Sequence, residues 1–97
     1  MDSLLQELKD KLNITWDEEE TNRKLNSILI DAEIILNYKL GATIDYYEEG
    51  PEHNLFLNYC MYAWNNCTNE FDDNYLNEIY QIRQKYEVLN YEKTKQL

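Results

Sequence analysis

Residues 14–21 read Ile-Thr-Trp-Asp-Glu-Glu-Glu-Thr and combine several signals of a helix start in one short junction. Thr15 and Glu18 have the spacing of a capping box, in which the hydroxyl and the carboxylate each accept a hydrogen bond from a backbone amide of the first turn. The acids that follow Trp16 would lie at the positive end of the helix dipole. The junction therefore predicts a helix that begins directly after Thr15. Trp16 either closes the junction as a buried plug or is exposed as an anchor for a partner.

Apolar residues at three- and four-residue spacing continue on both sides of this junction. Before it, a leucine stripe predicts a short amphipathic helix between Asp2 and Asn13. After it, a longer stripe predicts a second helix that ends at Gly41, because glycine readily adopts the left-handed conformation found after a helix end. The residues of the second stripe are Leu25, Ile28, Leu29, Ala32, Ile35, Leu36 and Leu40, and Ile34 widens it.

Residues 42–50 have the character of a loop and are rich in acids, with no Lys or Arg among them. Such a run usually only faces water, and this is one interpretation. The other is a segment that contacts a neighbouring subunit or lines a channel, because tyrosine is enriched at interfaces. The candidate contact residues of this loop are Tyr46, Tyr47, Glu48 and Glu49.

A third helix is predicted to begin at Pro51, since a proline in the first helical position needs no hydrogen-bond partner for its nitrogen. It is apolar nearly all round, so it should be the central helix and be covered on more than one side. After a break at residues 66–73, Phe71 is expected to pack on Leu76 and fix the start of a fourth helix. The stripe of that helix is predicted to contain Leu76, Ile79, either Ile82 or Arg83, Tyr86 and Leu89.

Length and composition indicate one small helical domain. The chain has 97 residues, with only 2 Gly and 1 Pro to build turns. We therefore expect an all-α fold: a compact bundle of about four helices, with a short acidic loop between helices two and three. The domain should cover residues 1–90, and the polar residues 91–97 should form a flexible tail.

The charge balance limits the classes of partner. The net charge is −10, which opposes binding to DNA phosphates because such binding depends on Lys and Arg. No apolar run approaches the length of about 20 residues that a membrane span requires, so we expect no membrane contact.

Catalytic and metal-binding arrangements are also not indicated. Cys60 and Cys67 lie seven residues apart on one predicted helix, too far along the axis for a disulfide, and should be reduced and buried. His53 continues the same row, but a straight helix cannot bring three such positions to one metal ion. With a single His and no recognisable nucleophile motif, we expect no enzyme activity, no metal and no cofactor.

Four stretches together resemble the head-tail connector family of tailed bacteriophages: the junction at residues 14–21, residues 55–67, and the Glu70-Phe71 and Leu76–Ile79 motifs. The resemblance extends over roughly residues 4–83. Its structural residues would be Thr15, Trp16, Asp17, Tyr59, Trp64 and Phe71.

The resemblance implies a structural adaptor that forms a ring, dodecameric in the virion, on the portal protein. That ring would link the DNA-filled head to a stopper or tail-completion protein, and the genome would pass through it without specific binding. The protein would then lie at the virion neck, and in the host cytoplasm before assembly. Besides the four loop residues, the candidate interface residues are Tyr62, Tyr80, Lys93 and Lys95, the two lysines facing the portal.

A second hypothesis also explains the acidic balance. The chain would be a binding module that mimics DNA and inhibits a host nucleic-acid-binding protein. Such a mimic needs carboxylates spread regularly over one face, whereas these acids concentrate at helix starts and in one loop.

Overall fold

The computed structural model describes the backbone of residues 2–95 and the side chains of residues 3–92. Within that part of the chain there are helices and no strands, which confirms the all-α prediction. The helices are α1 (Asp2–Lys11), α2 (Glu19–Leu40), α3 (Pro51–Trp64), the 3-10 turn η1 (Thr68–Glu70), α4 (Phe71–Asn74) and α5 (Leu76–Lys95).

The described residues form five α-helices and not about four, because the short helix α4 forms where a break was expected and is separated from α5 at Tyr75. The backbone there has φ −119° and ψ 21°, outside the helical range. Tyr75 still donates its amide hydrogen to Phe71 O, and Ile79 donates to Tyr75 O, so the hydrogen bonds continue across the break. At this bend the ring of Tyr75 stacks on Phe71, with the centroids 4.9 Å apart. Helices α4 and α5 therefore form one bent helical run.

The start of α2 also differs from the prediction. The helix begins at Glu19, Glu18 occupies the capping position in extended conformation, and no side chain caps the helix. Thr15 is exposed in the extended segment between α1 and α2. That segment is held by the α1 end instead, where Ile14 donates its amide hydrogen to Lys9 O at 2.8 Å. The predicted cap, Thr15, therefore lies three residues before the observed capping position, Glu18, and the predicted capping box does not form.

The two ends of the acidic loop are as expected. Gly41 follows α2 in the left-handed conformation, with φ 70°, and donates its amide hydrogen to Asn37 O. A side chain at this φ would be strained, so glycine suits the position. Pro51 is the first residue of α3, also as predicted.

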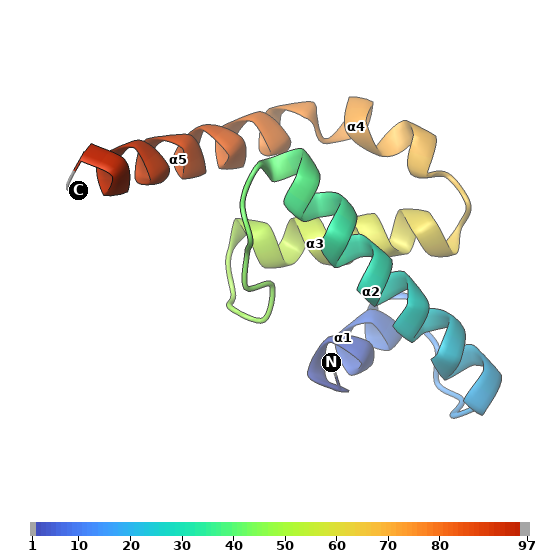
Figure 1. The fold of residues 1–97 in the computed structure, drawn as a ribbon. Coiled ribbons are helices and arrows are strands. Elements are labelled where there is room, and N and C mark those ends of the chain that lie inside the picture. The colour runs from blue at the N-terminus through green and yellow to red at the C-terminus, as the bar shows by residue number, and fades with distance from the viewer. Residues whose placement is uncertain (1, 96–97) are drawn as a thin grey trace.

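Helix α3 lies at the centre of the fold, and α2 crosses it (Figure 1). Helix α1 lies beside the N-terminal half of α2, and α5 lies on the side of α3 that faces away from α1. The core lies where these helices meet. Its most deeply buried side chains are Leu8, Leu25, Leu29, Leu36, Leu40, Phe56, Cys60 and Phe71.

Phe71 is buried in a different way from the one expected. Its ring makes edge contacts with Tyr59 and Tyr62 of α3, whereas Leu76, the expected partner, is 61% exposed. The aromatic cluster, rather than a staple along the chain, fixes the start of α4.

Helix α5 extends beyond the rest of the molecule (Figure 1). The radius of gyration is 14.7 Å, against about 13 Å for a compact domain of ~100 residues. The helix continues to Lys95, so the expected helix end near residue 90 is wrong, and residues 91–95 of the expected tail are helical. Residues 96–97 of that tail lie outside the described residues. No helix in the described part of the chain is both long and apolar enough to cross a membrane.

Candidate interaction surfaces

Tyr46 belongs to the core and not to an interface. It is 3% exposed, and its ring stacks on Phe56 with the centroids 4.6 Å apart. Its hydroxyl donates to Asn37 Oδ1 at 2.8 Å, and burial raises its pKa well above the usual range. Tyr46 was therefore wrongly predicted as a contact residue. Buried tyrosines usually find a partner for the hydroxyl, and Asn37 supplies it here.

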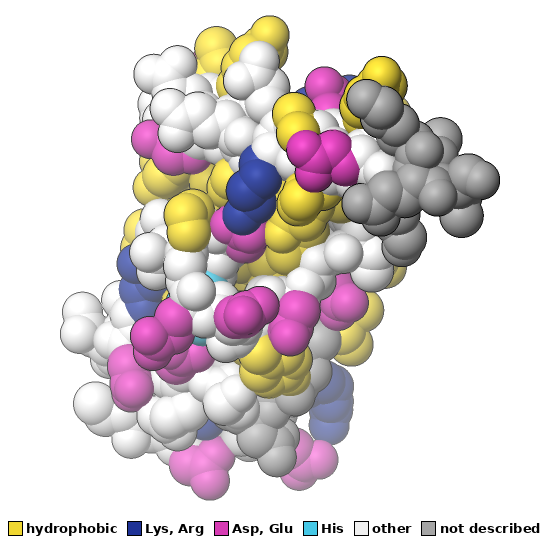
Figure 2. Space-filling view, turned by 90° about the vertical axis from the view of Figure 1, so that its left-hand side faces the viewer, with side chains coloured by type: hydrophobic (Ala, Val, Ile, Leu, Met, Phe, Trp, Pro, Cys, Tyr) yellow, Lys and Arg dark blue, Asp and Glu magenta, His cyan; other side chains and the backbone are white. Residues whose placement is uncertain are grey.

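The three residues that follow Tyr46 in the acidic loop are exposed, as are Thr43 and Asp45. Tyr47, Glu48 and Glu49 are exposed, and acidic side chains spread across this face of the molecule (Figure 2). A hollow of about 330 Å³ lies between the loop and α5, and Glu48 and Glu49 line it. These three predicted contact residues are accessible to a partner.

Glu52 connects the loop region to α5. One of its carboxylate oxygens accepts hydrogen bonds from Lys85 Nζ and from the Tyr86 hydroxyl, both at 2.8 Å. Burial acts to raise the pKa of Glu52, but the hydrogen bonds from Lys85 and Tyr86 outweigh it and the pKa is lowered. Burial and the bond to Glu52 raise the pKa of Tyr86 to about 12. The carboxylate thus fastens α3 to α5 at the point where α5 leaves the core.

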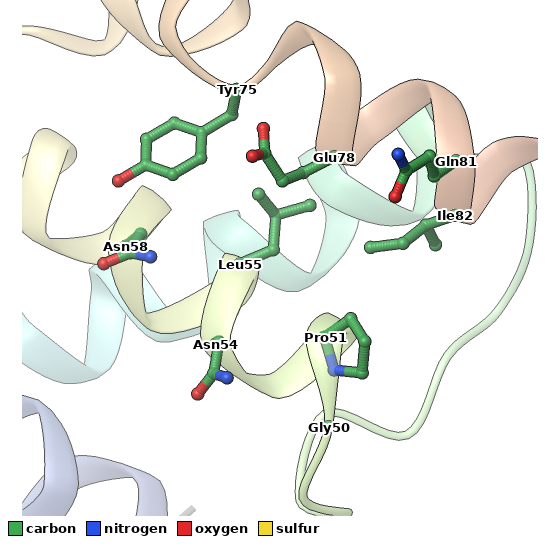
Figure 3. A pocket seen from close by; sticks show the side chains of 9 residues that line it. All are labelled: Gly50, Pro51, Asn54, Leu55, Asn58, Tyr75, Glu78, Gln81 and Ile82. Carbon is green, nitrogen blue, oxygen red and sulfur yellow. The ribbon is translucent and has the colours of Figure 1, made fainter.

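A groove of about 420 Å³ lies between α3 and α5 (Figure 3). Leu55 points from α3 toward α5, and Ile82 lies across from it on α5 (Figure 3). The groove is also lined by polar residues, namely Asn54, Asn58, Glu78 and Gln81. Sequence reasoning did not find this groove, because it forms only when the two helices pack together.

The outer face of α2 carries large exposed apolar side chains. Ile30 and Ile34 are 52% and 65% exposed, and Tyr38 is 87% exposed. Residues four apart lie on the same side of a helix, so the three form one stripe. We had assigned Ile34 to the buried stripe of this helix. The signal for a second stripe was the four-residue spacing itself, which places these residues away from the stripe of Leu25, Leu29 and Leu36.

The outer face of α5 is similar. Leu76 and Tyr80 are exposed near its start, while Ile79, Ile82 and Tyr86 face the core as predicted. Leu76, which we had assigned to the inner stripe, is therefore on the outside. Leu89 lies on the same side of α5 as Tyr86 and lines the hollow beside the acidic loop, but it is half exposed. Tyr80, a predicted interface residue, is 61% exposed and remains available.

The outer faces of α2 and α5 meet near the bend. Tyr38 and Leu76 line the same hollow of about 390 Å³, together with Ile79 and Arg83. We define the α2–α5 patch as Ile30, Ile34, Tyr38, Leu76 and Tyr80. Val88 and Tyr91 are also exposed, on the projecting end of α5, whereas Leu89 lines the hollow between the acidic loop and α5.

Tyr62, another predicted interface residue, has a role inside the fold. Its ring packs edge-on against Phe71 and Tyr75, and its hydroxyl accepts a hydrogen bond from Asn74 Nδ2 at 2.9 Å. It is only half-buried, so part of the ring is accessible. Tyr59 is buried beside it, as expected for a structural residue.

The two tryptophans are less buried than expected. Trp16 is 50% exposed, and its indole N–H donates to Thr21 Oγ1 at 3.3 Å, so the interpretation as a buried plug is wrong. Trp64 is partly buried, and the Lys24 ammonium lies 4.7 Å from the ring centroid. Both rings therefore lie at the surface beside α2.

Asp17 links α1 to α2 through its side chain, without capping a helix. Its carboxylate accepts a hydrogen bond from Asn22 Nδ2 at 2.7 Å and pairs with Lys9 Nζ at 3.5 Å. The hydrogen bond from Asn22 and the charge of Lys9 lower the pKa of Asp17. In the sequence, Asp17 was one of the residues that resemble the connector family. Its contact with Lys9 could not be predicted, because it depends on how α1 packs.

Cys60, Cys67 and His53 have separate surroundings in the structure. Burial raises the pKa of the Cys60 thiol to about 12, and both Cys60 and the partly buried Cys67 are free. His53 is buried, with Nδ1 2.6 Å from Tyr46 O and Nε2 3.2 Å from Glu7 Oε1. Among the residues that the structure describes, no three His, Cys, Asp or Glu side chains form a group that could hold a metal ion.

Lys93 and Lys95, predicted to face the portal, are part of the α5 backbone, but their side chains lie outside the described residues. Comparison of the chain with protein-family models, curated proteins and solved structures gave no match. The function must therefore be inferred from the surface and from the resemblance in sequence.

Proposed function

We propose that this protein is a structural adaptor of a tailed bacteriophage. In this proposal it forms a ring on the portal, dodecameric in the virion, and links the DNA-filled head to the stopper or tail. It would act at the virion neck, after a period in the host cytoplasm, through contacts rather than catalysis. The proposal depends on the resemblance of residues 14–21 and 55–67 to the connector family.

The observation that carries the proposal is the exposed α2–α5 patch. Monomeric proteins rarely expose contiguous apolar patches of large side chains unless those patches bind something. Tyr38 is 87% exposed, and Ile30, Ile34, Leu76 and Tyr80 are each more than half exposed. An adaptor in a ring would cover such residues with neighbouring subunits.

The charge of the chain is compatible with a channel for DNA. A net charge of −10 repels phosphates, so the strand would slide past the ring instead of adhering to it. Glu48 and Glu49 are exposed, and with Asp45 they line a common hollow, so the loop is our candidate for an acidic surface at the channel or at a partner.

The proposal is tested by binding of the purified chain to purified portal protein. We expect the chain to co-sediment with the portal and to remain bound in the presence of DNA. The double variant Glu48→Gln/Glu49→Gln provides a discriminating control. A DNA mimic would lose its partner when these charges are removed, whereas portal binding through apolar patches should persist.

The alternative function predicts a different result. If the chain mimics DNA, host nucleic-acid-binding proteins should retain it, the portal should not, and added DNA should compete. That outcome would overturn the adaptor proposal.

A further inference from the structure

The groove between α3 and α5 has a lining that suits the backbone of an extended peptide. We propose that it binds an extended, basic segment of another protein, with an apolar side chain over Leu55 and Ile82 and a Lys or Arg beside Glu78. The inference goes beyond the proposed function and does not depend on it, because it follows from the groove alone.

The groove has an apolar floor and polar edges. Leu55 and Ile82 are only 3% and 5% exposed and form the floor (Figure 3). The polar side chains along the edges are those of Asn54 and Asn58 of α3 and of Glu78 and Gln81 of α5. An apolar surface with a few polar groups around it is typical of sites that hold a ligand in one orientation.

The polar groups at the edges are available to a ligand. Within the described part of the chain, the side chains of these four residues take part in no hydrogen bond or ion pair, although Asn58 is half-buried. A carboxamide has an acceptor oxygen and two donor hydrogens, so it can pair with both the N–H and the C=O of a peptide backbone. The edges therefore offer hydrogen bonds that the fold itself does not use.

The spacing of the two asparagines matches an extended chain. Asn54 and Asn58 lie about 6 Å apart along the axis of α3, at ~1.5 Å per residue. In an extended chain, equivalent backbone groups recur every two residues, which is about 6.6 Å. The two carboxamides can therefore meet successive backbone groups on one edge of a peptide. A helical partner already pairs its own backbone groups and would leave the carboxamides unused.

The charges around the groove favour a basic segment. Glu78 is the one charged residue among the described residues that line it. At the end formed by Gly50 and Pro51, the groove adjoins the hollow beside the acidic loop, where Lys85 is already paired with Glu52 at 2.8 Å. The other acids of that hollow are Asp45, Glu48 and Glu49. A peptide with Lys or Arg at both ends would thus meet carboxylates at both ends, whereas an acidic peptide would be repelled.

The probe for this site is a pentapeptide with Lys at both ends, Leu at the centre and Thr between them, blocked by acetyl and amide groups. In an extended chain, its two Lys and its Leu face the same side. The peptide is titrated into the full chain labelled with nitrogen-15 and followed by NMR. We expect it to shift the side-chain amide signals of Asn54, Asn58 and Gln81, and to leave that of Asn22 unchanged.

Two variants with the same substitution on the same helix test the location. Gln81→Lys adds a positive charge in the groove, and Gln84→Lys adds it on the outer face of α5, where Gln84 lines a different hollow. Both positions are exposed, so the fold should persist, and circular dichroism checks this. We expect Gln81→Lys to raise the dissociation constant of the peptide at least about fivefold, and Gln84→Lys to leave it within about twofold.

Two altered peptides test the chemistry of the occupant. N-methylation of the backbone amides removes the donors that the carboxamides would bind, and Glu in place of both Lys reverses the charge. Each altered peptide should bind at least about fivefold more weakly than the original.

Four results would overturn the inference: unchanged groove signals at millimolar peptide, equal affinity of the Gln81→Lys and Gln84→Lys chains, or undiminished binding of either altered peptide. Portal binding is measured separately on the natural chain. If the groove binds the peptide but the chain fails to bind the portal, the peptide site stands and the adaptor function is wrong.

Discussion

The carboxylate of Asp17 lies between Lys9 of α1 and Asn22 of α2, so a single exposed side chain joins the first two helices. Removing the carboxylate should loosen this junction, because the hydrogen bond to Asn22 and the attraction to Lys9 are lost together. We therefore expect Asp17→Ala to lower the thermal midpoint. Thr15→Ala should leave it unchanged, since the exposed hydroxyl caps no helix. If both variants lowered the thermal midpoint equally, Thr15 would have to be the cap of α2 after all.

Glu52 should make the stability of the fold depend on pH. Its pKa is lowered in the folded chain from 4.5, so the stabilisation by Lys85 and Tyr86 is complete above pH 4.5 and is lost as the pH falls through the folded pKa. Glu52→Gln should therefore destabilise the protein at neutral pH by about 1 kcal/mol. Below pH 4 the difference should shrink, because the natural side chain is then neutral as well.

Urea unfolding of the two proteins at several pH values measures this difference. Tyr47→Ser, at an exposed loop position, should show no pH-dependent difference from the natural chain and is the control. A Glu52→Gln effect of constant size down to pH 3 would show that the charge of Glu52 does not contribute.

At the scale of the helix, α5 carries apolar residues on two faces, and only one face is packed. Ile82 is buried, whereas Leu76 is 61% exposed. Ile82→Ala should therefore cost about 2–5 kcal/mol, while Leu76→Ala should stay within about 0.5 kcal/mol. Chemical denaturation of both variants measures these values. A large loss for Leu76→Ala with a small one for Ile82→Ala would mean that the opposite face of α5 is the packed one.

The parts of each helix that the sequence predicted are those fixed by neighbouring residues. Gly41 and Pro51 mark their helix ends because the left-handed φ and the missing amide act locally. The start of α2 and the bend at Tyr75 depend on contacts with α1 and with Phe71, which adjacent residues do not encode.

The interaction surface was harder to predict for the same reason. Apolar spacing finds a stripe on a helix, but it does not tell which of two stripes the core will cover. Tyr46 and Tyr47 are neighbours of the same type, yet one is buried against Phe56 and the other is half exposed. Only the path of the loop around Asn37 separates them. Tyr80, a predicted interface residue, is exposed, and Tyr38 and Ile34, which were not among the predicted interface residues, are exposed as well.

At the scale of the whole molecule, a small core is combined with a large uncovered surface. Helix α5 is mostly exposed, and of its described side chains only Ile82 is fully buried. A chain of this length buries only about 60–65% of its unfolded surface, so additional burial between copies would raise its stability. The central claim is therefore that the α2–α5 patch is open in the free chain and covered in the assembled state.

Hydroxyl-radical footprinting of tyrosine tests this claim most directly. Tyr38 and Tyr80 should react rapidly in the free chain and should be protected in the complex with the portal, while the buried Tyr46 should react slowly in both. Equal reactivity of Tyr38 and Tyr80 in the free chain and in the complex would contradict the account.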